Sequence, residues 1–312
     1  MKKINLITVT GPTAGGKTQF AAHLAKGLDS EIISADSRQV YKDMNLGTGK
    51  DYEDYVINGI QIPYHLIDIH EAGYKYNVFE FQQDFIKAFE EISLRNKIPV
   101  LAGGTGMYIE AVTKGYKLIN VPINERLRAA LDKKNLEELV TILKSLKPEL
   151  HNKTDITNKK RTIRAIEIAT FYESNEQLDT NFPEIRQLIF GIKYDRGSRR
   201  KRISQRLTLR LESGMIQEVE QLLKKVNAED LIFYGLEYKF ITQFLTGSLT
   251  KDEMTKKLET AIHQFAKRQM TWFRKMEREG TKIYWIDGHM SLEDKLNRAK
   301  IILSKYDIAL NY

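Results

Sequence analysis

The feature that most constrains this chain is the run GPTAGGKT, which occupies residues 11–18. Two glycines separated by four residues, followed at once by Lys17 and Thr18, complete the Walker A spacing. The apolar run 6–9 precedes the loop, and a helical pattern follows it. Glycines allow backbone N–H groups to turn around a phosphate, and the helix N-terminus adds partial positive charge. The run therefore predicts a di- or triphosphate site beside a buried strand.

Each residue type in this loop has an expected role. Lys17 reaches a terminal phosphate, and the Thr18 hydroxyl is the expected ligand of Mg²⁺, the only cofactor predicted. Loops of this kind are typical of ATP-binding and other nucleotide-binding proteins. The alternative is a glycine-rich turn with an exposed lysine, which the flanking strand and helix disfavour. The predicted phosphate-binding residues are Gly11, Pro12, Thr13, Ala14, Gly15, Gly16, Lys17 and Thr18.

Short β-branched runs alternate with helical patterns over the first hundred residues. This alternation predicts βαβ units and a parallel sheet. A helix is expected over 77–95, where Asn77 and Glu80 form an N-terminal capping pair. Strands are expected at 6–9, 31–34, 63–69, 99–102, 187–193 and 283–286.

The pattern from 117 to 182 is helical throughout. Helices are expected there at 126–133, 136–146 and 159–172, and two long helices follow at 199–226 and 251–278. We therefore predict an α/β fold with a P-loop NTPase-like core, whose parallel sheet is flanked by helices and interrupted by an all-helical insertion domain. The predicted divisions are 1–116, 117–186 and 187–312.

Composition narrows the possible functions. Lysine and arginine number 49 against 41 acidic residues, which gives a net charge of +8 and favours a polyanionic partner. The absence of cysteine excludes disulfides, thiolate zinc sites and cysteine nucleophiles, and it suits a reducing compartment. No stretch approaches 18 apolar residues, so we expect a soluble, cytoplasmic protein with no membrane partner.

A polar cluster follows the second expected strand. Asp36 comes directly after the run 31–34, and Ser37, Arg38 and Gln39 follow it. A carboxylate at the carboxyl end of a strand next to a phosphate loop faces the bound ligand. The alternative is a surface aspartate that caps the next turn. The position of this cluster favours a role in the site.

These segments closely resemble the tRNA dimethylallyltransferases, also called tRNA isopentenyltransferases. The resemblance begins with GPTAGGKT and ISADSRQVYKDM and continues in the family's order, from about residue 4 to 287. The other matching segments are PYHLIDI at 63–69, PVLAGGTGMYIEAV at 99–112, KKRTIRAIEI at 159–168, RKRISQRLTLRLESGMIQEVEQLL at 200–223 and AKRQMTWFRK at 266–275.

Three segments depart from the family pattern. The chain has GTGKD at 47–51 where the family commonly has GTAKP, and YGLEYKF at 234–240 where it usually has IGYKE. The stretch HNKTDITNKK at 151–160 lacks the usual proline–aspartate turn. We expect all three to lie outside the phosphate loop and the Asp36 cluster, and to alter tRNA contacts more than the chemistry.

The resemblance implies a reaction. A dimethylallyl group passes from dimethylallyl diphosphate to the exocyclic N6 amine of the adenosine 3′-adjacent to the anticodon, position 37, in tRNAs reading codons that begin with U. Pyrophosphate is released. Lys17 and Thr18 would hold the diphosphate and Mg²⁺, and Asp36 would accept the amine proton.

The arginine-rich helix is expected to supply a second clamp on the pyrophosphate. Arg199, Arg202, Arg206 and Arg210 share one helical face, which by itself could equally be a solvated surface. The resemblance favours a catalytic role for Arg202 and Arg206 and leaves the other two undecided.

The implied partner is the tRNA anticodon stem-loop, whose adenine must leave its stack to reach the pocket. We expect a monomer. Trp272 shares its helical spacing with apolar residues and is expected in the core rather than against a base. The residues implied to contact tRNA are Asp36, Ser37, Arg38, Gln39, Thr105, Arg128, Lys160, Arg161, Arg164, Lys267, Arg268 and Gln269.

Three other functions remain open at this stage. A small-molecule kinase would hold ATP in the loop and use Asp36 to activate a hydroxyl. An isopentenyltransferase acting on free adenine nucleotide would share the loop and the aspartate but have little use for the helical insertion. A non-enzymatic RNA-binding NTPase would leave Asp36 and the arginine-rich helix unexplained.

Overall fold

Six parallel strands form one sheet, in the order β5-β2-β6-β1-β7-β8. The computed structural model describes residues 3–147, 156–173 and 182–311. The strands of the sheet are β1 (Leu6–Thr10), β2 (Ile32–Ser34), β5 (Tyr64–His65), β6 (Val100–Gly103), β7 (Gln187–Lys193) and β8 (Ile283–Asp287). The predicted fold class is confirmed, and every neighbouring pair of strands in this sheet runs parallel.

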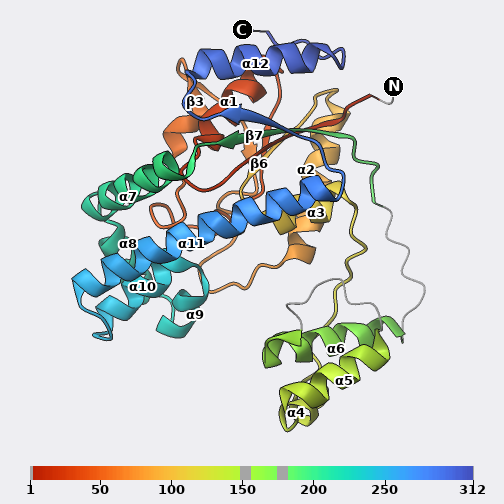
Figure 1. The fold of residues 1–312 in the computed structure, drawn as a ribbon, viewed down its shortest axis with the longest axis vertical. Coiled ribbons are helices and arrows are strands. Elements are labelled where there is room, and N and C mark those ends of the chain that lie inside the picture. Colours follow the sequence, from red (N-terminus) through yellow and green to blue (C-terminus); the bar gives the residue numbers. More distant parts are fainter. Residues whose placement is uncertain (1–2, 148–155, 174–181, 312) are drawn as a thin grey trace. The chain divides into compact units, whose positions relative to one another are not determined.

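Alternate side chains of each strand enter different cores, as the pleat requires. Leu6 and Ile189 join one core and Ile7 and Leu188 the other. The first core is covered by α2 (Val78–Leu94), α3 (Gly106–Thr113), α7 (Arg196–Glu212) and α11 (Lys251–Arg278). The second is covered by α1 (Lys17–Gly27) and α12 (Leu292–Ser304), which lies at the top of Figure 1.

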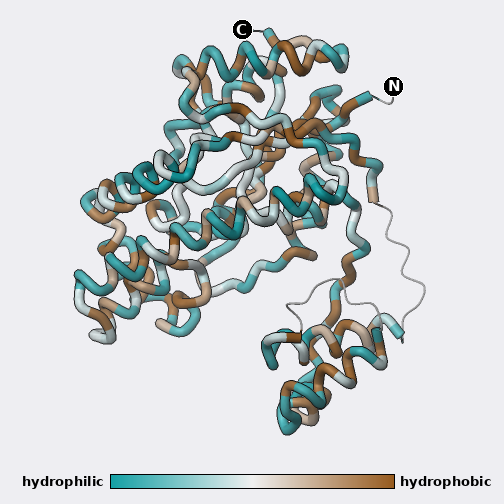
Figure 2. Tube along the Cα trace, viewed as in Figure 1, coloured by the Kyte–Doolittle hydropathy of each residue, from teal (hydrophilic) through white to brown (hydrophobic). Residues whose placement is uncertain are grey.

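Helix boundaries follow local signals closely. Asn77 caps α2 through a capping box with Glu80, as predicted. Hydrophilic and hydrophobic residues alternate along α11 in Figure 2, which is typical of a helix with one buried face. Trp272 packs against the first core and covers Gly106, which confirms its predicted place.

Two predicted elements were wrong in extent. The single helix expected at 199–226 is broken by Gly214, whose φ of 101° ends α7 and begins α8 (Met215–Leu223). The strand expected at 63–69 stops after His65, because Leu66 and Asp68 adopt positive φ angles of 63° and 55°. Neither angle suits a strand.

The remaining elements are short. A hairpin of β3 (Val56–Ile57) and β4 (Ile60–Gln61) follows the turn η1 (Tyr52–Tyr55). After α8 come α9 (Ala228–Phe233) and α10 (Leu236–Leu245), which pack against α8 and α11. None of the helices in the described ranges is long and apolar enough to cross a membrane.

The contacts divide the chain into two compact units, Met1–Tyr116 with Phe182–Tyr312, and Lys117–Asn181. The second unit contains α4 (Glu125–Asp132), α5 (Leu136–Leu146) and α6 (Lys159–Glu173) around a small core of its own. Residues 151–155, the first half of the departing stretch 151–160, lie outside the described residues.

Candidate active site

The phosphate loop connects β1 to α1 at the carboxyl edge of the sheet. Gly16 occupies the N-cap of α1 with a left-handed φ of 71°, and no side chain caps the helix. The first N–H groups of α1 therefore face the loop interior, where they can bind an anion. Gly11 is required by close packing, because a Cβ there would lie 2.3 Å from the Ile192 carbonyl oxygen of β7.

Lys17 is half-buried in this loop, and its Nζ donates to the Pro12 carbonyl oxygen at 2.9 Å. Burial, together with the nearby positive charge of Arg206, lowers the pKa of Lys17 to about 8, although the Asp36 carboxylate opposes this shift. The ammonium group is thus held without a full complement of counter-charge. A bound diphosphate would supply that charge.

Two arginines of α7 contact the same loop. Arg202 donates from Nε to the Ala14 carbonyl oxygen at 3.0 Å, and Arg206 donates to the Thr13 hydroxyl. Burial and the neighbouring Arg210 lower the pKa of Arg206 to about 10. Arg199, whose role the sequence left undecided, lines a separate groove. The helix therefore divides its arginines between two sites.

Gln269 of α11 closes the loop from the other side. Its side-chain carbonyl accepts from the Thr13 N–H at 2.8 Å, and its amide donates to the Gly104 carbonyl oxygen at 3.0 Å. The side chain is 8% exposed. Gln269 was predicted to contact tRNA, but in this structure it joins the phosphate loop to the segment after β6.

The Asp36 cluster follows β2 on the same edge of the sheet. One Asp36 carboxylate oxygen accepts from the Arg38 N–H at 2.9 Å, and the Ser37 N–H donates to the Thr105 hydroxyl at 3.4 Å. The Gln39 amide donates to the Gly49 carbonyl oxygen at 3.1 Å. Parallel strands β2 and β6 thus bring together residues that are far apart in the sequence.

The loop and the cluster line one cavity of about 360 Å³. Its volume lies in the range of small-molecule sites. Arg268 lines it too, with its guanidinium carbon 5.9 Å from the centre of the Phe265 ring. The predicted residues that line the cavity are Thr13, Ala14, Gly15, Gly16, Lys17, Thr18, Asp36, Ser37, Arg38, Gln39, Thr105, Arg206, Arg268 and Gln269.

Two of the departing segments also line this cavity, which corrects the expectation that they lie outside the site. Gly49 packs directly beneath Arg210, since a Cβ there would lie 2.6 Å from a guanidinium nitrogen. Arg210, which is 9% exposed, pairs with Asp51 at 3.2 Å. Glu237 of the second segment lines the cavity as well, and burial raises the pKa of its carboxyl.

Glu218 of α8 is a supporting residue that sequence reasoning missed. Its carboxylate accepts three backbone N–H groups, from Asn45, Leu46 and Gly47, at 2.6–3.0 Å. The Tyr238 hydroxyl donates to it at 2.7 Å. Glu218 therefore fixes the segment that carries Gly49. In the sequence Glu218 is one of three glutamates in the arginine-rich match 200–223, and no local pattern separates it from Glu212 and Glu220.

The four insertion residues that were predicted to contact tRNA differ in whether they already have partners within the protein. Arg128 and Arg164 both pair with the buried Glu167, with Arg128 at 2.8 Å. Burial alone would raise the pKa of Glu167, but hydrogen bonds from Arg128, the Asn124 N–H and Arg164 lower it to about 2. Lys160 and Arg161 are exposed. The guanidinium groups of Arg128 and Arg164 thus stabilise the internal structure of this unit, whereas Lys160 and Arg161 are open to solvent.

The family model described as IPP transferase matches residues 39–276, and the model described as Isopentenyl transferase matches residues 4–62. The chain belongs to the IPP transferase family. It is 57% identical to tRNA dimethylallyltransferase 1 of Parabacteroides distasonis, over 97% of this chain and 99% of that one. It is 55% identical to tRNA dimethylallyltransferase 2 of Bacteroides fragilis, over 98% and 100% of the two chains.

Solved structures of the family share the fold. The tRNA isopentenylpyrophosphate transferase of Bacillus halodurans superposes with a TM-score of 0.71, at 29% identity over 98% of this chain and 97% of that one. A eukaryotic dimethylallyltransferase acting on tRNA gives a TM-score of 0.79 at 22% identity, over 99% and 81% of the two chains.

Proposed function

We propose that this protein transfers a dimethylallyl group from dimethylallyl diphosphate to the N6 amine of an adenosine in tRNA. The observation that carries the proposal is the shared cavity. The half-buried Lys17 and Arg206 converge on the phosphate loop, and Asp36 lines the same space. One cavity can therefore hold the leaving group and the acceptor amine together.

Each bond and proton of the reaction can be assigned to a group in this cavity. The C–O bond of the allylic diphosphate breaks, and its electron pair leaves with the pyrophosphate. The amine lone pair forms the new C–N bond, and Asp36 accepts the proton that the nitrogen loses. Lys17, Arg202 and Arg206 stabilise the negative charge of the departing pyrophosphate.

Mg²⁺ fits the oxygen donors of this site. The Thr18 hydroxyl lines the cavity and makes no hydrogen bond within the described residues. Mg²⁺ usually takes one or two protein oxygens and completes its shell with phosphate and water. Thr18 would hold the ion, which would neutralise charge on the diphosphate. Across the described ranges no cluster of three or more His, Cys, Asp or Glu offers a different metal site.

For the acceptor, we propose the adenosine at position 37, next to the anticodon, in tRNAs that read codons beginning with U. Asp36, Ser37 and Gln39 would receive the extruded base, and Thr105 and Arg268 would contact the flanking nucleotides. Lys160 and Arg161 of the insertion would hold RNA phosphates. The relatives named for tRNA and the +8 charge support this acceptor.

One labelling experiment tests the proposal. The protein is incubated with radiolabelled dimethylallyl diphosphate, Mg²⁺ and an equimolar mixture of unmodified tRNA, AMP and a non-cognate RNA. We expect label in tRNA alone, at the adenosine beside the anticodon. Label in AMP would show a free-nucleotide isopentenyltransferase. Hydrolysis of added ATP coupled to phosphorylation of a small molecule, without prenyl transfer, would show a kinase.

A further inference from the structure

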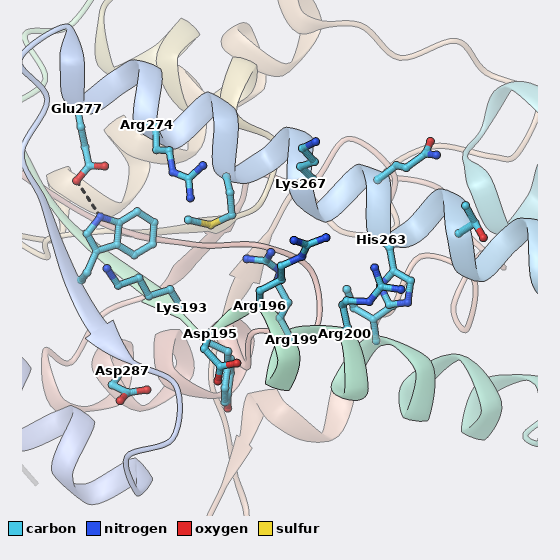
Figure 3. A pocket seen from close by; sticks show the side chains of 16 residues that line it. Lys193, Asp195, Arg196, Arg199, Arg200, His263, Lys267, Arg274, Glu277 and Asp287 are labelled. Carbon is cyan, nitrogen blue, oxygen red and sulfur yellow. Dashed lines mark hydrogen bonds between the residues drawn. The ribbon is translucent and has the colours of Figure 1, made fainter.

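A second and larger cavity, of about 1040 Å³, lies between the first half of α7 and the centre of α11 (Figure 3). The carboxyl ends of β7 and β8 form its floor with Lys193 and Asp287. Figure 3 shows the side chains of α7 extending toward those of α11 across the opening. We call this cavity the α7–α11 groove.

The groove has an excess of positive charge, because its lysines and arginines outnumber its three carboxylates, Asp195, Glu277 and Asp287. Six positive side chains line it, and none of them forms a salt bridge within the residues that the structure describes. They come from the end of β7, the first turns of α7 and one face of α11. These residues are Lys193, Arg196, Arg199, Arg200, Lys267 and Arg274.

The acidic side chains of the groove already have other partners. Asp195 pairs with His289 at 3.0 Å, and Glu277 accepts from the Trp285 indole nitrogen at 2.8 Å. Asp287 accepts from the His289 N–H at 3.0 Å. Burial, followed by the positive charges of Arg274 and Arg196, lowers the pKa of Arg199. Converging like charges destabilise one another, and an anion in the groove would relieve that repulsion.

The α7–α11 groove is separate from the proposed active site. On α11, the groove is lined by His263, Lys267 and Arg274, whereas the active-site cavity is lined by Phe265 and Gln269. At 3.6 residues per turn these two sets lie on different faces of the helix. An anion in the groove therefore does not compete for the phosphate loop.

We propose that the α7–α11 groove binds the phosphate backbone of a single RNA strand next to the modified loop, an inference that rests on the proposed function. Its volume is nearly three times that of the active-site cavity, more than one diphosphate needs. Lys267 and Arg274 are seven residues apart, about 10 Å along the helix, which spreads charge over successive phosphates. Guanidinium groups suit such phosphates.

The aromatic residues of the groove favour backbone over base recognition. Lys193 lies over the Trp285 ring at 5.3 Å, and Arg202 lies over the Tyr194 ring at 4.5 Å. Those ring faces are thus occupied by cations rather than free for stacking. The RNA contact should therefore be insensitive to sequence and sensitive to salt.

A matched pair of triple variants tests the groove. The first carries Arg196→Ala, Arg199→Ala and Arg274→Ala. The control carries Lys256→Ala, Arg298→Ala and Lys300→Ala, which removes the same charge from exposed positions outside both cavities. Binding of an unmodified anticodon stem-loop RNA is measured by fluorescence anisotropy over a range of salt concentrations. Dimethylallyl diphosphate and inorganic pyrophosphate are titrated separately.

We expect the first variant to lower the slope of log affinity against log salt by about two, since each single-strand phosphate contact contributes about 0.7. The control should keep the wild-type slope, and both should bind dimethylallyl diphosphate normally. A wild-type slope in the first variant would overturn the groove proposal. So would unchanged RNA binding with a specific loss of pyrophosphate affinity, which would indicate a small polyphosphate site.

These outcomes are separable from the proposed function, because they measure binding and not transfer. If the wild-type protein binds RNA through the groove but transfers no label to tRNA, the proposed function is refuted and the groove proposal still stands.

A direct test of the groove uses the absence of cysteine in the chain. Gln264→Cys in the groove, coupled to a photocrosslinker, should crosslink to the RNA, whereas Lys300→Cys should not. Equal crosslinking from both positions would also overturn the proposal.

Discussion

The protonated form of Lys17 is destabilised in the free protein, because burial and the positive charge of Arg206 lower its pKa to about 8. A diphosphate binds the protonated form and raises this pKa when it binds. Affinity for dimethylallyl diphosphate should therefore be full below pH 8 and decrease as the pH rises above it, by up to about tenfold per unit.

Calorimetric titration of the donor between pH 7 and 9.5 checks this prediction. In Lys17→Gln the donor should bind more weakly at every pH, and the inflection near pH 8 should vanish, because the titrating group is gone. A variant that retains the inflection would assign it to another group. The pKa of Arg206, at about 10, lies above this window.

Asp36 offers a substitution that changes charge but keeps shape. Its carboxylate accepts the Arg38 N–H, and an asparagine carbonyl could accept the same hydrogen bond. Asp36→Asn should therefore keep the turn and bind both substrates, yet lower kcat by about 10²–10⁴-fold through loss of the proton acceptor. Single-turnover measurement with labelled donor separates the two effects. Near-normal turnover would end the assignment of Asp36 as the base.

At the scale of elements, α11 supports the phosphate loop through one side chain. Gln269→Leu would leave the Thr13 N–H and the Gly104 carbonyl without their partner. Each unsatisfied buried group costs about 1–3 kcal/mol, so we expect a clear loss of stability and weaker donor binding. Urea denaturation and donor titration measure both. Gln221→Leu, at an exposed position of α8, should change neither.

The contact between the 47–51 segment and α7 has a matched control within the chain. Gly49 and Gly59 have nearly equal φ angles, 75° and 76°, but only Gly49 has a neighbour, Arg210. Both alanine variants should lose about 1–2 kcal/mol, because alanine disfavours this backbone conformation. Only Gly49→Ala should also raise the KM for the donor, by displacing Arg210 beside Arg206. An equal KM for the donor in the two variants would show that the position of Arg210 does not affect donor binding.

At the scale of the whole molecule, the insertion can be removed at its own boundaries. Phe182 packs against Gly115, where a Cβ would lie 3.2 Å from its ring, so a short glycine linker can join the two ends. Deletion of 117–181 should leave donor binding intact and weaken tRNA binding without abolishing it, because the α7–α11 groove remains, as measured by calorimetry and filter binding. Undiminished tRNA affinity would place RNA recognition in the rest of the chain.

The phosphate loop, the alternation of strands and helices and the helical character of the insertion are signalled locally, and so the sequence alone predicts them. Glycine spacing, capping residues and helical periodicity each act over a few neighbouring positions. The two errors of extent have the same local origin. Gly214 and the positive φ angles of Leu66 and Asp68 interrupt patterns that hydrophobicity alone would continue.

The partners of each charged side chain were decided only by the tertiary structure. The arginines of α7 look equivalent in sequence, yet Arg206 contacts the loop, Arg210 pairs with Asp51, and Arg199 lines a different cavity. Sequence spacing fixes which residues share a helical face. What that face meets depends on segments more than 150 positions away, which are brought into contact when the parallel strands pair and the helices pack over them.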